Sequence, residues 1–183
     1  MAILPIKIMG TPILREPAQE VGEPTHGHRK LISDLFDTMR DAPGLGLAAP
    51  QVGVGLRIFV WEVEEAHGAV VDPVIVERSD VTVDGEEGCL SIPGLLYEVP
   101  RSDRIVVEGK DENGRPLRID ASDFLARVFQ HEIDHLDGVL FIDRLSPDLR
   151  EEAITRWRDL LLSPEGVTPY SGRTSEVAPE API

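Results

Sequence analysis

The sequence predicts an α+β domain in which antiparallel or mixed β-sheets pack around a central helix, with one helix before it and one after it. Two observations support this prediction. Residues 28–39, 122–138 and 146–162 carry apolar side chains at the three- and four-residue spacings of amphipathic helices. Between residues 56 and 119, short β-branched runs alternate with turn signals. The predicted central helix carries a His-Glu-x-x-His motif.

The first predicted helix presents Leu31, Leu35 and Met39 on one face. It should end near Pro43-Gly44, because a proline disfavours helix in the residue before it and glycine ends helices at little cost. A glycine-rich apolar stretch follows at 44–51.

The predicted strands occupy residues 57–62, 70–77, 81–84, 104–108 and 116–119. Asp84-Gly85 and Asn113-Gly114 are the strongest turn signals between them, and the second reads as a hairpin turn. The segment is therefore interpreted as an antiparallel β region.

The second helix should begin at Ser122, a plausible N-cap, and end near Asp137-Gly138. The third should run from Ser146-Pro147 to Leu162. Residues 163–183 are rich in proline, serine and glutamate, so we expect a disordered tail. Residues 1–162 would then form a single catalytic domain, as the length of 183 residues allows.

The net charge of −15 argues against nucleic acid or a membrane surface as a direct partner, because the field of the protein repels phosphate. The one cysteine excludes an internal disulfide. The N-terminus lacks the pattern of a signal peptide, and no apolar run reaches the roughly 18 residues of a membrane span. We expect a cytoplasmic monomer.

A metal site is indicated by residues 130–138. His131 and His135 are four apart, so on a helix both imidazoles project from one face and can share a metal. Glu132 lies beside that face, where its carboxylate can reach a metal-bound water as general base.

A catalytic metal usually has three protein ligands, so a third must come from elsewhere. Metzincin peptidases place a histidine where this chain has Phe141, which cannot ligate. A gluzincin peptidase would use a downstream glutamate, for which Glu151 and Glu152 are poorly placed. Cys89 is the better candidate, because glycine and polar residues flank it in Glu87-Gly88-Cys89-Leu90-Ser91.

Three segments together resemble the signature motifs of the peptide deformylase family. They are Gly44-Leu45-Gly46-Leu47-Ala48-Ala49-Pro50-Gln51, the Cys89 segment, and Gln130-His131-Glu132-Ile133-Asp134-His135. Their order and separations are also similar to the family's, as are residues 10–15 and Pro100-Arg101. The resemblance covers residues 1 to about 145.

The resemblance implies an enzyme that removes the formyl group from the N-terminal methionine of newly synthesised proteins and releases formate. The metal would be ferrous iron (Fe2+), which Ni2+, Co2+ or Zn2+ can replace, held by Cys89, His131 and His135. Glu132 would take a proton from the attacking water and deliver it to the leaving amine. The amide of Gln51 and the backbone N–H of Leu90 would stabilise the oxyanion.

The resemblance also assigns substrate contacts. The backbone of Leu45, Gly46 and Gly88 would contact the peptide, and Gly44 with Gly46 would let it lie close like an added strand. An apolar slot for the methionine would be lined by Phe124, Val128 and Leu45.

Arg127 is interpreted as a side chain that reaches solvent at the mouth of this slot. Glu87 and Arg101 are interpreted as an ion pair that braces the cysteine segment. The partners implied are formylmethionyl nascent peptides, and transient contact with the ribosome is left open.

Two alternatives remain at this point. A zinc endopeptidase would cleave internal peptide bonds and keep its metal without Cys89. A structural metal protein would need a fourth ligand to close its site, and the spare histidines His26, His28 and His67 lack convincing spacing for that role.

Overall fold

The computed structural model describes residues 2–164 and 166–167. Its larger sheet has the strand order β1-β2-β3-β6-β7, and every neighbouring pair is antiparallel. A separate antiparallel pair is formed by β4 and β5. The strands are β1 (Gly46–Ala48), β2 (Ile58–Val63), β3 (Ala66–Arg78), β4 (Thr82–Glu87), β5 (Tyr97–Ser102), β6 (Arg104–Lys110) and β7 (Pro116–Ser122).

Three α-helices and three short 3₁₀ turns complete the described part of the chain. The helices are α1 (His26–Asp41), α2 (Asp123–Leu136) and α3 (Pro147–Leu162), and the turns are η1 (Pro12–Arg15), η2 (Ala49–Val52) and η3 (Phe141–Arg144). The α+β class and the three helices predicted from the sequence are confirmed. Asn113-Gly114 forms the β6–β7 hairpin turn as predicted, with Gly114 at a φ of 81°.

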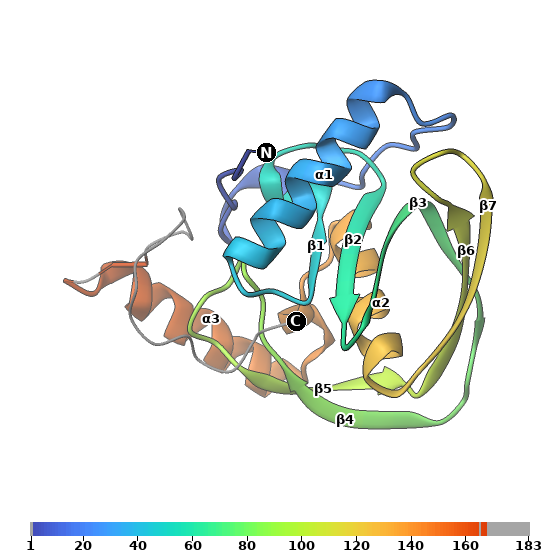
Figure 1. Cartoon of the computed structure of the whole chain (residues 1–183). Helices are drawn as coiled ribbons and strands as arrows, with labels where there is room; N and C mark the ends of the chain where they lie inside the picture. The colour runs from blue at the N-terminus through green and yellow to red at the C-terminus, as the bar shows by residue number, and fades with distance from the viewer. Residues whose placement is uncertain (1, 165, 168–183) are drawn as a thin grey trace.

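Strand β2 is covered by a helix on each face, which explains its run of apolar residues. Alternate side chains of a strand point to opposite faces. Ile58 and Val60 pack in one cluster with α1, whereas Phe59 and Trp61 pack in another with α2. Figure 1 shows α1 in front of β1 and β2, and α2 behind them. Helix α2 is therefore the central helix, in contact with β1, β2, β5, β6 and β7.

A third apolar cluster joins the β4–β5 region to the C-terminal helix. Cys89, Val99, Phe141 and Trp157 all belong to it. The cluster fixes the loop after β4 against η3 and α3. In this way the segment with the single cysteine is held beside α2.

One turn prediction was wrong: Asp84-Gly85 lies inside β4, where Asp84 pairs with Pro100 and Gly85 with Val99. The φ angle of Gly85 is not among the positive ones, so this glycine makes no turn. Its role is steric.

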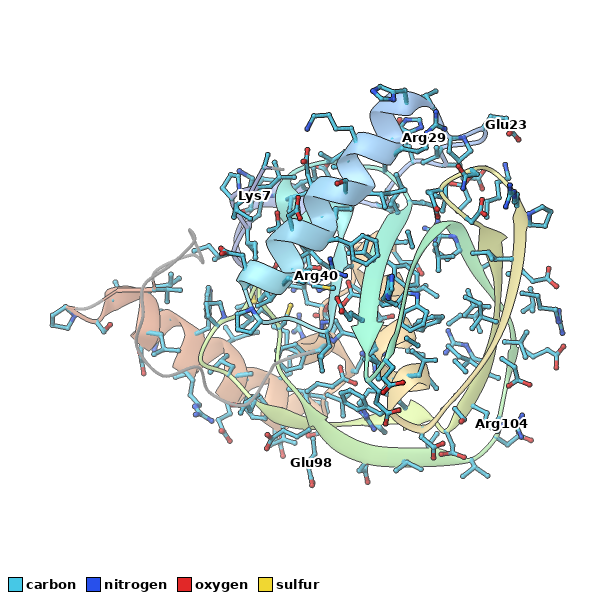
Figure 2. All side chains as sticks on the ribbon, viewed as in Figure 1. Lys7, Glu23, Arg29, Arg40, Glu98 and Arg104 are labelled. Atoms are coloured by element: carbon cyan, nitrogen blue, oxygen red, sulfur yellow. The ribbon has the colours of Figure 1, made fainter. Side chains whose placement is uncertain are left out.

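Glu98 and Arg104 are among the exposed charged side chains. Figure 2 shows Glu98 and Arg104 pointing away from the body of the molecule. No helix within the described residues has the length and apolarity needed to cross a membrane. Most of the predicted tail, residues 165 and 168–183, lies outside the described residues, so the prediction of disorder stays a prediction.

Candidate metal centre

Cys89, His131 and His135 lie together in the interior of the protein. One ligand atom from each lies within 4.8 Å of the others. The Sγ of Cys89 is 3.2 Å from the Nε2 of His135. All three residues are buried, with exposed fractions of 2%, 2% and 1%.

The cluster is assembled by two elements. Helix α2 presents His131 and His135 one turn apart on the same face, with ring centroids 5.0 Å apart. Cys89 lies in the segment after β4 and approaches the histidines from the β4–β5 region. The sequence spacing of the histidines is local, whereas their approach to Cys89 depends on the packing of α2 against the β4–β5 region.

The residues present fit a metal ion. The Nε2 of His131 is buried and has no hydrogen-bond partner among the described residues. Burial raises the pKa of the Cys89 thiol to about 12, so the thiolate needs a nearby cation. Imidazole and thiolate donors suit zinc, iron, cobalt and nickel better than magnesium or calcium. Three such donors without a fourth protein ligand are the usual arrangement for a catalytic site.

Glu87 orients one of the two histidines. Its Oε2 accepts a hydrogen bond from the Nδ1 of His131 at 3.0 Å, which leaves Nε2 free to face the cluster. Arg101 donates two hydrogen bonds of 2.8 and 2.9 Å to the same carboxylate, so the predicted Glu87–Arg101 ion pair is present. Burial alone would raise the pKa of Glu87, but the bonds from Arg101 and His131 outweigh it and lower the pKa strongly.

The network extends to residues that the sequence interpretation missed. Arg101 also donates to Asp134 at 2.6 Å, and Asp134 accepts two bonds from Arg144. Asp134 lies between the two histidines in the sequence, so its helical position was available as a signal. Its partner Arg144, in η3, carried no such signal.

Glu132 lies beside the cluster with both carboxylate oxygens buried and without a hydrogen-bond partner among the described residues. Burial raises its pKa well above the ordinary value, and the charge of Glu87 raises it further. Burial thus favours the protonated form of this carboxyl group more than water does, which suits a group that must accept a proton and then return it.

The position of the Glu132 side chain leaves no room for a Cβ at Gly46. A Cβ added there would overlap the Oε1 of Glu132 and lie 2.8 Å from its Cδ and Cγ. The backbone of β1 therefore lies directly against the Glu132 carboxylate. The glycine spacing, which the sequence interpretation connected with a bound peptide, also makes room for this side chain.

We expect Gly46→Ala to lower kcat by about 10- to 100-fold, because displacing a catalytic group by about 1 Å can cost 100-fold. The measurement is the rate of the reaction proposed below, with metal content determined in parallel. Gly55→Ala is the matched control, since a Cβ at Gly55 meets only Ile13 Cδ1 at 4.0 Å. Equal rates for both variants and the unsubstituted protein would contradict the assigned contact.

The side-chain amide of Gln51 and the backbone N–H of Leu90 are the two hydrogen-bond donors expected to stabilise the oxyanion. The Oε1 of Gln51 accepts from the Ala48 N–H at 2.8 Å, which turns its amide nitrogen towards Ser91 Oγ at 3.3 Å and Cys89 Sγ at 3.7 Å. Within residues 2–164 and 166–167 the backbone N–H of Leu90 has no acceptor. The Leu90 side chain itself packs in the core with α1 and β2.

The glycine loop leads into an edge strand. Strand β1 pairs with β2 on one side and is the end of the five-stranded sheet among the described residues. Leu45 precedes it and accepts a bond from the Glu62 N–H at 2.9 Å. Gly44 packs on Leu90, where a Cβ would come within 2.8 Å of Cδ1. Gly88 is buried directly before Cys89.

The residues expected to line an apolar slot occupy different environments. Phe124 is 43% exposed and lines a cavity of about 220 Å³ together with Gly85, Arg101 and Arg127. Val128 is fully buried in the core with α2 and β2 and is not among the residues that line this cavity.

The interpretation of Arg127 as a solvent-reaching side chain was wrong. Only 7% of the residue is exposed, and its guanidinium donates to Glu87 and to carbonyl groups of β4 and β5. Those acceptors are backbone atoms, which a sequence pattern does not reveal.

Phe141, at the position of a metzincin histidine, stacks on the His131 ring at 6.2 Å between centroids and offers no ligand atom. The candidate glutamates are not at the cluster. Glu151 and Glu152 are exposed on α3, and Glu152 accepts a bond from the Tyr97 hydroxyl at 3.0 Å.

Comparison with known proteins agrees with this geometry. The model of the polypeptide deformylase family matches residues 3–151. The chain belongs to the peptide deformylase family. A peptide deformylase of Acidothermus cellulolyticus is 51% identical over 159 residues, which are 87% of this chain and 88% of that protein.

Solved structures of the peptide deformylase family share the fold. The enzyme of Thermus thermophilus superposes with a TM-score of 0.81 at 46% identity, covering 86% of this chain and 94% of that one. The Ehrlichia chaffeensis enzyme in complex with actinonin gives 0.84 at 38% identity, covering 89% and 100%. The family assignment from the sequence motifs is thereby confirmed.

Proposed function

We propose that this chain hydrolyses the formyl group from the N-terminal methionine of newly synthesised proteins, using a metal held by Cys89, His131 and His135. The observation that carries the proposal is the buried cluster of these three residues beside Glu132, whose carboxylate has no hydrogen-bond partner among the described residues. Membership of the peptide deformylase family supports it.

The proposed native metal is Fe2+, which Ni2+, Co2+ or Zn2+ can replace. A divalent metal held by these residues would act as a Lewis acid, which lowers the pKa of a water molecule towards about 7. The donor set supports this proposal, because one thiolate and two imidazoles bind all four of these metals. Oxidation of the thiolate by oxygen would be promoted most strongly by ferrous iron.

Glu132 moves the proton in the proposed mechanism. Its carboxylate takes a proton from the attacking water and delivers it to the amine that leaves when the formyl C–N bond breaks. The formyl carbon departs as formate. The raised pKa of the buried Glu132 supports the first transfer, because a carboxylate with a raised pKa is a stronger base than an ordinary one.

Gln51 and Leu90 are proposed to stabilise the oxygen of the formyl group as negative charge develops on it. The Gln51 amide is held with its nitrogen towards Cys89, and the Leu90 N–H has no acceptor within the described part of the chain. Donors fixed in advance act strongly in a buried site, and removing one typically costs about 2.7–4 kcal/mol.

The peptide part of the substrate is proposed to pair with the free edge of β1, contacting the backbone of Gly44, Leu45 and Gly46. Gly88 would lie on the other side of the bound chain. The methionine side chain is proposed to lie near Leu45 and Val128. The cavity lined by Phe124 suits it poorly, because Asp84, Asp103, Asp123, Arg101 and Arg127 also line that cavity.

The location and partners of the enzyme are proposed from its substrate and from its net charge. Formylmethionyl chains are made in the cytoplasm of bacteria, so a cytoplasmic location is proposed. The enzyme is proposed to act as a monomer on these nascent chains. The charge of −15 argues against direct binding to RNA, which leaves only transient ribosome contact. Co-sedimentation with ribosomes bearing nascent chains tests this part separately.

The proposed activity is tested by measuring formate release from a formyl-Met-Ala-Ser peptide by anaerobically prepared, metal-loaded enzyme. We expect rapid release, and no cleavage of internal bonds in unformylated peptides. Internal cleavage without formate release would favour the endopeptidase alternative. Full metal content with neither activity would favour a structural metal site.

A further inference from the structure

Arg127 is a buried cation that the proposed reaction does not use. It lies on α2 one turn before His131, on the same helix face. Its Nη1 donates to Glu87 Oε1 at 2.8 Å and to the Val99 carbonyl at 2.7 Å, and its Nη2 donates to the Val83 carbonyl at 2.7 Å. One side chain of α2 is thus bonded to both β4 and β5.

The carboxylate of Glu87 joins this contact to the metal cluster. Its Oε1 accepts from Arg101 and Arg127, and its Oε2 accepts from Arg101 and the Nδ1 of His131. Arg101 comes from β5, whereas Arg127 and His131 come from α2. Arg127 therefore fixes Glu87 against the helix that carries the histidines. Glu87 is the last residue of β4 and lies two residues before Cys89.

Gly85 provides the space that this arrangement needs. A Cβ at Gly85 would lie 2.8 Å from the Nη2 of Arg127 and 2.9 Å from its Cζ and Nε. Real Cβ atoms essentially never come this close to another atom, so the guanidinium would have to move out of its bonds to Glu87, Val99 and Val83. Because Gly85 is in regular strand pairing with Val99, its lack of a side chain is explained by Arg127.

We infer that Arg127 and Gly85 form a matched pair of positioning residues that sets the β4–β5 region on α2 and so holds Glu87, His131 and Cys89 in register. The inference rests on the proposed metal site and extends it to residues outside the ligands. A planar guanidinium with five N–H donors suits several acceptors on two strands, which a lysine cannot match.

A double-mutant cycle tests the pairing. Arg127→Leu, Gly85→Ala and the double variant are loaded with Co2+, and metal release to a chelator is followed together with the visible spectrum of the bound cobalt. We expect Arg127→Leu to speed release about 10-fold, since loss of outer-shell partners typically costs 10- to 100-fold in metal affinity. Gly85→Ala should act in the same direction, yet add less than about twofold in the Arg127→Leu background.

Two further variants complete the experiment. Arg127→Lys should recover less than half of the loss, because it keeps the charge but not the planar fork. Arg104→Leu is the matched control, since Arg104 is an exposed arginine that pairs with Asp120 on the outer surface (Figure 2). It should leave release and spectrum unchanged.

Three results would overturn the inference. They are additive effects of Arg127→Leu and Gly85→Ala, full rescue by lysine, and a cobalt spectrum and release rate unchanged by Arg127→Leu. If Arg127→Leu does not fold, Gly85→Ala is compared with Gly55→Ala, and faster release only in the first is the expected result. Equal release from those two would contradict the pairing. None of these readouts uses formate, so failure of the proposed activity is recognised independently.

Discussion

Glu132→Gln is expected to lower kcat for formate release by about 10²- to 10⁴-fold, the usual contribution of a positioned general acid or base. Glutamine has nearly the same shape but cannot accept the proton of the attacking water. Neither oxygen of Glu132 has a hydrogen-bond partner among the described residues, so the substitution breaks no ion pair there. The variant should therefore fold normally and keep its metal.

The measurement combines steady-state kinetics with metal analysis of the same sample. Glu98→Gln is the control, because Glu98 points away from the body of the molecule (Figure 2). A Glu132→Gln enzyme that keeps its metal and retains a kcat within about threefold of the unsubstituted enzyme would remove Glu132 from the proton transfer. Loss of metal would instead show that Glu132 helps to hold it.

Cys89→Ala is expected to weaken metal binding by more than about 100-fold, because loss of a ligand should exceed the 10- to 100-fold cost of losing an outer-shell partner. Formate release should fall in proportion to the metal lost. The apo-protein should remain folded, since the Cys89 side chain packs in an apolar cluster that alanine only partly empties. Equilibrium dialysis against buffered Co2+ measures the affinity directly.

His26→Ala serves as the control for removal of a metal-binding residue type, since His26 is exposed at the start of α1. A Cys89→Ala variant that binds one metal with unchanged affinity would contradict the three-ligand site. It would revive the endopeptidase alternative, in which the two histidines and another residue hold the metal.

The sequence predicted the parts of the site that depend on local spacing. His131, Glu132 and His135 lie on one helix, and their i, i+1 and i+4 positions determine their common face. The three helices were predicted for the same reason. Cys89 was preferred because glycine and polar residues flank it, and the family resemblance then assigned it as a ligand. No local spacing relates it to the histidines, which lie more than 40 positions later.

Features that depend on packing were not predictable from the sequence. Strand β5 contains Pro100, which reads as a break, yet it pairs with Asp84 along a two-stranded edge where a missing N–H is tolerated. Gly85 reads as a turn residue, but the space beside it belongs to Arg127 from α2. The buried carbonyl partners of Arg127 likewise leave no trace in a sequence pattern.

The most direct test of the account is a titration of the metal-free enzyme with Fe2+ under argon, following formate release from formyl-Met-Ala-Ser. We expect no release before metal is added, then a linear rise that ends at one equivalent of metal for each chain. Formate release by the metal-free enzyme, or none at full occupancy, would contradict the claim that one metal at Cys89, His131 and His135 supports deformylation.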